Sequence, residues 1–358
     1  MNIESHQSAA AGAFAASTLP LVQTLERLQR RQPLSREESS ALLDSLLDPS
    51  TKDEQIAAIL TALAEKGETA EELTGMAEAM RARMVNLKCD HPRVIDTAGT
   101  GASKAKTFNV STAAAFVIAA AGLPIAKHGA KAATSNSGSA DVLQSLGIDV
   151  QAAPATSART LAQHNLCFLF APQYHPAAAR VAPIRRQLAF RTVFNLIGPL
   201  SSPSRAKHQV LGVSHPELLP TMAAALANLG CERGWVVHGE DGLDEVSLAA
   251  PTQVTEVRDG SLKSFTLSPE LFGLRRDDCS HLRAASAEAS ARQTESVLEN
   301  KADSCAMNLV VLNAAAALVV GLDLFPRDAA ELARTTIASG AAREKLETLR
   351  TIAKEQGA

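Results

Sequence analysis

Residues 96–112 of this chain, DTAGTGASKAKTFNVST, are the stretch that decides its fold class. The apolar residues before it predict a short strand, Gly99 and Gly101 predict a tight turn, and a predicted helix begins near Asn109. A glycine turn between a strand and a helix presents free backbone N–H groups and the positive end of the helix dipole to an anion. The stretch matches neither the dinucleotide fingerprint GxGxxG nor the Walker sequence GxxxxGK. Alone, it is compatible with a phosphate-binding turn or with an ordinary turn of an α/β protein.

The alternation of strand and helix continues beyond this stretch. Apolar runs at 167–172, 208–214 and 233–239 predict further strands, separated by helical segments. This pattern favours a mainly parallel sheet with helices on both faces. Residues 252–267 are different, because two alternating runs meet at Asp259-Gly260 and predict an antiparallel hairpin. Residues 284–358 return to long alanine-rich helices.

The N-terminal part is predicted to be all helical. Leu21, Leu25 and Leu28 follow a helical period, and Ser35 with Glu38 forms a predicted capping box. We expect a structural or dimerising bundle here. The expected domains are a flexible tail at 1–18, a helical domain at 19–88 with 173–200 returning to it or forming the hinge, and an α/β domain at 89–172 and 201–358.

The composition predicts a soluble globular protein. Apolar residues make up 46 % and charged residues 20 % of the 358 residues, and the net charge is −3 without a long basic run. Nucleic acid is therefore not the expected partner. No stretch of about 18 strongly apolar residues is recognised, and the N-terminus lacks the basic start of a signal peptide, so we expect a cytoplasmic protein without a membrane span. The cysteines are scattered and are expected to be unpaired, neither in disulfides nor in a zinc site; they are Cys89, Cys167, Cys231, Cys279 and Cys305.

A second polar loop follows the next predicted strand. In KHGAKAATSNSGSADVL, residues 127–143, three basic side chains could neutralise phosphate and several hydroxyls could donate hydrogen bonds. Two consecutive strand ends with such loops suit a ligand in the crevice at the carboxyl edge of the sheet. Ser137 as an N-cap and Lys131 as a solvated charge would explain only part of this loop.

Two further stretches add charged candidates. Asp244 and Glu245 could hold Mg²⁺ through carboxylate oxygens, although such a pair on a loop is more often simply solvated. Arg185, Arg186 and Arg191 lie in an apolar helical segment, where each guanidinium needs an anion. That anion could be a ligand, or it could be a carboxylate of the acidic helical part.

Taken in order, these stretches resemble the anthranilate phosphoribosyltransferase family, the type IV phosphoribosyltransferases of tryptophan biosynthesis. The likeness covers roughly residues 20–350. It rests on GTG at 99–101, TFNVST at 107–112, KHG at 127–129, SGSAD at 137–141, RTVFNLIGPL at 191–200, DGLDEVSL at 241–248 and NAAAAL at 313–318.

The resemblance implies a nucleoside phosphorylase-like α/β fold, a homodimer formed through the helical domains, and Mg²⁺. It implies that anthranilate displaces pyrophosphate from 5-phosphoribosyl 1-diphosphate (PRPP), with no catalytic acid or base assigned. His128, Ala130 and Arg185 would lie by the acceptor, and Ser111, Asp244 and Glu245 by the metal ions. The residues implied to bind PRPP are Gly99, Thr100, Gly101, Thr107, Asn109, Ser111, Thr112, Lys127, Ser135 and Ser139.

The chain departs from the family pattern in both loops. Ala102 and Ser103 stand where the family usually has Gly-Asp after GTG, and Lys104 follows them. Ala130-Lys131 stands where the family usually has Asn-Arg. The replaced asparagine normally contacts the acceptor. Three explanations remain open: an anthranilate enzyme with a changed loop, a paralogue with a different aromatic or heterocyclic acceptor, or a nucleic-acid-binding family member with weak catalysis.

Overall fold

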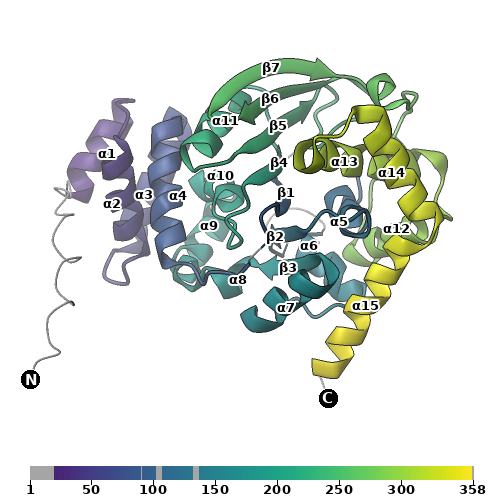
Figure 1. Ribbon diagram of the computed structural model, residues 1–358. Helices are drawn as coiled ribbons and strands as arrows, with labels where there is room; N and C mark the ends of the chain where they lie inside the picture. Colours follow the sequence, from purple (N-terminus) through teal and green to yellow (C-terminus); the bar gives the residue numbers. More distant parts are fainter. Residues whose placement is uncertain (1–19, 90, 102–106, 132–136, 357–358) are drawn as a thin grey trace, which may run out of the picture.

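In the part of the chain that the structure describes, seven strands form one sheet in the order β3-β2-β1-β4-β5-β6-β7 (Figure 1). This computed structural model describes residues 20–89, 91–101, 107–131 and 137–356. Strands β1 to β5 pair in parallel, and β6 and β7 are antiparallel. The expected mainly parallel α/β sheet is therefore confirmed. The strands are β1 (Ile95–Gly99), β2 (Ile125–Gly129), β3 (Leu166–Phe170), β4 (His208–Gly212), β5 (Arg233–Gly239), β6 (Thr252–Arg258) and β7 (Ser261–Leu267).

The last two strands form the hairpin that the sequence predicts. Arg258 pairs with Ser261, and the two residues between them have positive φ angles, 49° at Asp259 and 79° at Gly260. Two successive left-handed residues match the right-handed twist of the flanking strands, which explains the Asp-Gly pair.

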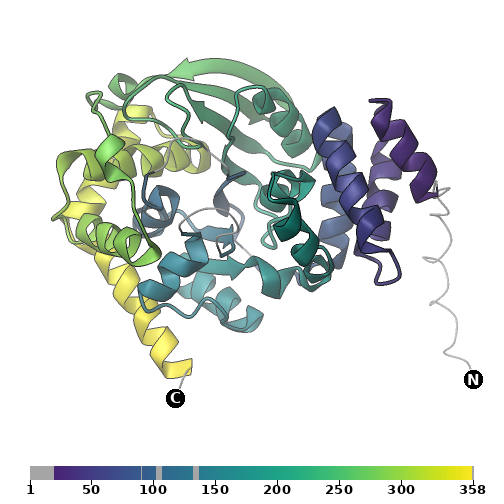
Figure 2. The ribbon, with the colours of Figure 1, turned by 180° about the vertical axis from the view of Figure 1, so that it is seen from behind.

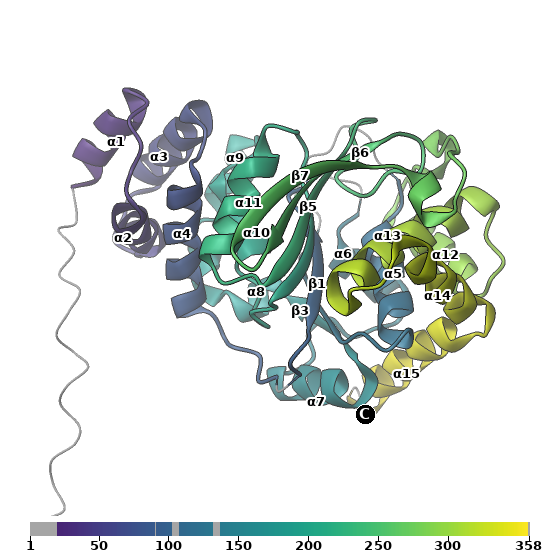
Figure 3. The same ribbon diagram turned by 45° about the horizontal axis from the view of Figure 1, so that its top comes forward.

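Helices cover both faces of the sheet (Figure 3). Helices α5 and α13 pack on one face through a large apolar cluster that includes Phe116, Val117 and Leu312, all completely buried. Helices α10 and α11 cover the opposite face near β4 to β6. The helices of this part are α5 (Val110–Ala120), α6 (Ser139–Ser145), α7 (Pro154–His164), α8 (Ala171–Tyr174), η1 (Pro176–Arg180), α9 (Ala182–Leu188), α10 (Val193–Leu200), α11 (Leu218–Asn228), η2 (Pro269–Phe272), η3 (Ser280–Leu282), α12 (Ala287–Leu298), α13 (Ser304–Leu322), α14 (Pro326–Ala338) and α15 (Ala341–Gln356).

The N-terminal helices are α1 (Leu21–Gln29), α2 (Arg36–Leu47), α3 (Asp53–Lys66) and α4 (Ala70–Arg83). They lie at the opposite end of the molecule from α12 to α15, as the front and back views both show (Figures 1 and 2). The capping box at Ser35 and Glu38 is present and confirms that helix start. The predicted tail, residues 1–18, lies outside the described residues.

Residues 173–200 connect the two parts of the molecule. Ile184 of α9 and Ile197 of α10 belong to the same buried cluster as Leu43 of α2 and Met76 of α4, and Leu226 of α11 belongs to it as well. The helical part and one face of the α/β part therefore share a continuous apolar core at this segment.

The expectation that every cysteine is unpaired is wrong. Cys279 and Cys305 form a disulfide, with their Cα atoms 6.1 Å apart. The pair joins the segment before η3 to the first turn of α13, and the cysteines are 26 positions apart, so no short motif in the sequence marks them. Cys167 and Cys231 are free thiols, and both are buried.

Helix α13 corrects a second expectation. By length and hydropathy, 2.1 over an 18-residue window, it could cross a membrane, so the statement that no such window exists is wrong. However, 78 % of this window is buried inside the protein, where α13 packs against α5, α14 and β4. The helix owes its hydropathy to its place in the core, with alanines allowing close packing.

Candidate functional site

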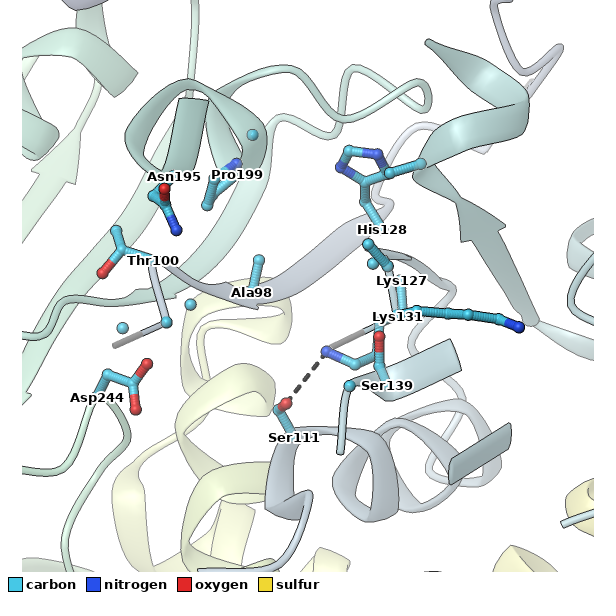
Figure 4. A pocket seen from close by; sticks show the side chains of 18 of the residues that line it. Ala98, Thr100, Ser111, Lys127, His128, Lys131, Ser139, Asn195, Pro199 and Asp244 are labelled. Carbon is cyan, nitrogen blue, oxygen red and sulfur yellow. Dashed lines mark hydrogen bonds between the residues drawn. The ribbon is translucent and has the colours of Figure 1, made fainter. Parts of the chain in front are cut away.

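A cavity of about 780 Å³ opens at the carboxyl ends of β1, β2 and β4 (Figure 4). The strand order reverses between β1 and β4, which is the position where open α/β sheets bind ligands. Polar loops after these strands line one end of the cavity. Residues 171–201 and Met80 of α4 contribute most of the other end. We call these the loop end and the helical end.

The turn after β1 is held against β4. The backbone N–H of Thr100 donates to the Gly212 carbonyl at 2.9 Å, and the Thr100 hydroxyl accepts from the Ser214 N–H at 3.2 Å. Gly212 must be glycine, because a Cβ atom there would lie 1.6 Å from the Asp244 carbonyl oxygen. Gly99, Thr100 and Gly101 line the cavity, and Ala102, Ser103 and Lys104 lie outside the described residues.

Thr107, Asn109 and Ser111 line the cavity at the start of α5. Asn109 is fixed by Ser290 of α12, whose hydroxyl accepts from the Asn109 N–H at 2.9 Å and donates to Asn109 Oδ1 at 3.0 Å. Sequence reasoning missed Ser290, since nothing local connects residues 181 positions apart. Thr112 is completely buried within α5 and does not line the cavity.

Lys127 brings a buried ammonium group to the centre of the site. Its Nζ donates to the Thr97 carbonyl and to Ser111 Oγ, the latter at 3.1 Å, as Figure 4 shows. Burial lowers the Lys127 pKa, and the carboxylates of Asp96 and Glu245 oppose that shift. An anionic ligand in the cavity would supply the negative charge that favours the protonated amine.

The loop after β2 approaches α6 closely. A Cβ atom at Gly129 would lie 2.1 Å from Ser139 Oγ, so a larger residue there would force this hydroxyl to move. Ser139 lines the cavity, whereas Ser135 lies outside the described residues. Gly138, and not Ser137, is the N-cap of α6, and the Ser137 hydroxyl instead donates to Asn109 Oδ1 at 2.9 Å.

Asp244 and Glu245 place two carboxylates in the same cavity. Figure 4 shows Asp244 and Thr100 across the cavity from Lys127 and Ser139. Burial, and then the charge of Asp244, raise the pKa of Glu245 to about 8. The Thr107 hydroxyl donates to Glu245 Oε2 at 3.4 Å and offsets only part of this.

The two carboxylates suit a divalent cation. Each repels the ionised form of the other, and a cation between them and a substrate phosphate would remove that penalty. Within the described ranges no group of three or more His, Cys, Asp or Glu side chains could hold a metal by itself. This donor set fits Mg²⁺, which usually takes one or two carboxylates and completes its shell with water and phosphate oxygens.

Two histidines meet at the helical end. The rings of His128 and His175 have centroids 5.1 Å apart. Burial lowers the pKa of His128 to about 3 and that of His175 to about 4, so both rings are neutral at pH 7. His128 Nε2 and both ring nitrogens of His175 make no hydrogen bond of good geometry with the described residues. Sequence reasoning missed His175, which stands alone in HPAAAR.

The sequence left open whether the anion beside Arg185 is a ligand or a carboxylate of the helical part. The Arg185 guanidinium lies 5.2 Å from the ring centroid of Phe194, burial lowers its pKa, and it has no ion pair with the described residues. Arg191 donates to Ser214 at 3.3 Å, and Arg180 makes the ion pair with Asp53 of the helical part at 2.7 Å. Arg185 is therefore available for an anion inside the cavity, which Arg186 and Ala130 also line.

Family models for both parts match the chain. The glycosyl transferase family helical bundle domain matches residues 22–84, and the glycosyl transferase family a/b domain matches residues 91–343. The anthranilate phosphoribosyltransferase of Thermomicrobium roseum is 44 % identical over 92 % of this chain and 95 % of its own length. The chain belongs to the anthranilate phosphoribosyltransferase family. The resemblance stated from the sequence motifs is therefore confirmed, and the family consists of glycosyltransferases.

Solved structures of the family share this fold. Anthranilate phosphoribosyltransferase from Thermus thermophilus superimposes with a TM-score of 0.86 at 36 % identity, covering 92 % of this chain and 99 % of that one. The Saccharomyces cerevisiae enzyme in complex with PRPP and Mg superimposes with a TM-score of 0.84 at 29 % identity, covering 94 % and 98 %.

Proposed function

We propose that this protein transfers the phosphoribosyl group of PRPP to anthranilate, giving N-(5-phosphoribosyl)anthranilate and pyrophosphate in tryptophan biosynthesis. In this reaction the bond from ribose C1 to the diphosphate oxygen breaks, and a bond from C1 to the amine nitrogen forms. The observation that carries the proposal is the division of one cavity into an end with a buried lysine and a carboxylate pair, and an end with an unpaired arginine and two neutral histidines.

The loop end is suited to the diphosphate of PRPP. Loss of pyrophosphate develops negative charge on the leaving group, so fixed cations and hydrogen-bond donors stabilise the transition state more than the ground state. Lys127 supplies a positive charge, and Thr107, Asn109, Ser111 and Ser139 supply donors at the starts of α5 and α6. Gly99, Thr100 and Gly101 allow close approach of the backbone, and Ser135 remains a prediction from the family motif. Thr112, completely buried in α5, is not included among the proposed PRPP ligands.

Asp244 and Glu245 are the proposed Mg²⁺ ligands, with Ser111 nearby. A magnesium ion bound there would neutralise diphosphate charge and so favour departure of the leaving group. The Ser111 hydroxyl already accepts a hydrogen bond from Lys127, which orients its oxygen. The donor set supports this assignment because the two carboxylates destabilise each other's charge without a cation.

The helical end is suited to anthranilate. Arg185, which lies over the Phe194 ring and has no ion pair with the described residues, would bind the carboxylate. His128 and His175 place neutral rings at the same end of the cavity. An aromatic amine attacks in its neutral form, so holding it at the correct distance from ribose C1 supplies much of the catalysis.

The proposal also includes a homodimer formed through the helical domains and a cytoplasmic location. The half-buried Leu21 and Leu25 and the exposed Val22 of α1 support the dimer, since they leave apolar surface at the edge of the helical part. The location rests on the sequence expectation and on a biosynthetic role.

Pyrophosphate release from PRPP in the presence of Mg²⁺, with and without anthranilate, tests the proposal. We expect anthranilate-dependent release and a product with the mass of phosphoribosyl-anthranilate. Arg185→Gln should raise the KM for anthranilate at least tenfold, whereas Arg159→Gln, an exposed position on α7, is the matched control. No release at millimolar anthranilate would rule out this function.

A further inference from the structure

Alanine side chains line the helical end of the cavity and the loop after β2. Ala171 belongs to α8, Ala179 to η1 and Ala182 to α9, and Ala130 follows β2. None of these four belongs to, or packs against, the apolar core clusters of the described residues. Packing of the core therefore does not require them to be small, since a larger side chain there would extend into the cavity.

The backbone beneath these alanines is held in place. The Ala130 carbonyl accepts from the Ala140 N–H at 3.3 Å, which ties the loop after β2 to α6. On the other side, the Ala178 N–H donates to the His175 carbonyl at 3.0 Å and the Arg180 side chain anchors η1 to α3 through Asp53. These interactions hold the backbone that carries the methyl groups in a defined position.

The polar groups of this end define what an acceptor must carry. Arg185 is suited to an anion, and the neutral rings of His128 and His175 line the same cavity. An aromatic ring with a carboxylate fits this combination of one cation and neutral rings. The alanines that line the cavity present small apolar methyl groups, which would exclude additional ring carbons neither by size nor by polarity.

We propose that the acceptor site accepts fused bicyclic aromatic 2-aminocarboxylates in addition to a single-ring acceptor, and that Ala130 and Ala179 determine this range. The inference rests on the proposed function, because it concerns the acceptor of the same transfer. The chemistry at the reacting atoms is unchanged: the amine nitrogen bonds to ribose C1 as the bond from C1 to the diphosphate oxygen breaks. The nitrogen then loses one proton to the departing pyrophosphate or to water. Only the apolar part of the acceptor grows.

The test compares anthranilate with 3-amino-2-naphthoate, which keeps the same amine and carboxylate and adds a second ring. With Mg²⁺ and PRPP, we expect kcat/KM for the naphthoate to lie within about tenfold of that for anthranilate. Ala179→Leu should lower the ratio of naphthoate to anthranilate kcat/KM at least tenfold, since one or a few methylene groups in an apolar pocket change discrimination by about 10–200-fold. Ala338→Leu, at an exposed position of α14, should leave the ratio unchanged.

The outcomes separate the inference from the function on which it rests. Turnover of anthranilate with naphthoate kcat/KM more than a hundredfold lower would overturn the wide acceptor site and leave the proposed function intact. Absence of turnover with either compound would overturn the proposed function itself. Turnover of both with an unchanged ratio in Ala179→Leu and in Ala130→Leu would overturn the assignment of these residues.

Discussion

Glu245 predicts an unusual pH dependence of stability for the ligand-free protein. Burial and the charge of Asp244 raise its pKa from 4.5 to about 8 in the folded protein. Between these two values the folded protein holds a proton that the unfolded chain has released. Stability therefore falls as pH rises through this window, by at most about 1.4 kcal/mol per pH unit. From pH 6 to pH 8 the expected loss is about 2 kcal/mol.

Glu245→Gln isolates this effect because glutamine resembles the protonated side chain. Urea unfolding of ligand-free wild type and variant at pH 6 and pH 8 gives two differences in the free energy of unfolding. From pH 6 to pH 8, the free energy of unfolding of the variant should rise by about 2 kcal/mol relative to that of the wild type. Asp96, whose pKa burial raises to about 6, acts mainly below this range and is common to both proteins. Equal pH slopes in wild type and variant would refute the burial argument.

Binding of Mg²⁺ and PRPP should favour the ionised form of Glu245, whereas burial in the ligand-free protein favours the protonated form. A cation beside Glu245 favours its ionised form, so binding near pH 7 should release a proton from the wild-type protein. Calorimetry in two buffers of different ionisation enthalpy measures the number of protons released on binding. Glu245→Gln should release fewer protons, and an identical release would mean that Glu245 does not face the bound metal.

Three further variants test separate parts of the site and fold. Arg185→Lys should raise the KM for anthranilate more than it lowers kcat, because a single ammonium replaces a guanidinium that can form two hydrogen bonds with the carboxylate; steady-state kinetics would disprove this if only kcat changed. Gly212→Ala should abolish Mg²⁺-dependent activity and lower the thermal midpoint, because its Cβ would lie 1.6 Å from the Asp244 carbonyl oxygen; a fully active, equally stable variant contradicts the close approach. The double variant Cys279→Ser/Cys305→Ser should lose about 3–4 kcal/mol of stability in denaturant under non-reducing conditions, as expected for a loop with a separation of 26 residues; equal stability would mean that the bridge does not form in solution.

Features that depend on neighbouring residues could be predicted before the structure was considered. The Ser35 capping box, the Asp259-Gly260 hairpin and the glycine turn after β1 each follow from the chemistry of a few adjacent residues. The family motifs at 99–101, 107–112 and 127–129 likewise indicated the loop end of the cavity, and most of their residues line it. Thr112 was included because it continues a motif, yet the helical period turns it into the core.

Features that join distant segments could not be predicted in this way. Ser290 holds Asn109 across 181 positions, and His175 meets His128 from another element. Cys279 pairs with Cys305 although η3 and α12 lie between them in the sequence. The pKa of Glu245 depends on how deeply its loop is buried, and the hydropathy of α13 could be interpreted only once its neighbours were known. The sequence alone thus determined the order of elements, the phosphate-type turns and the family, because these follow from local periodicity and turn chemistry. Only the tertiary structure decided which groups share the cavity, which cysteines pair and which charges lose their water, because those properties arise when distant segments pack together.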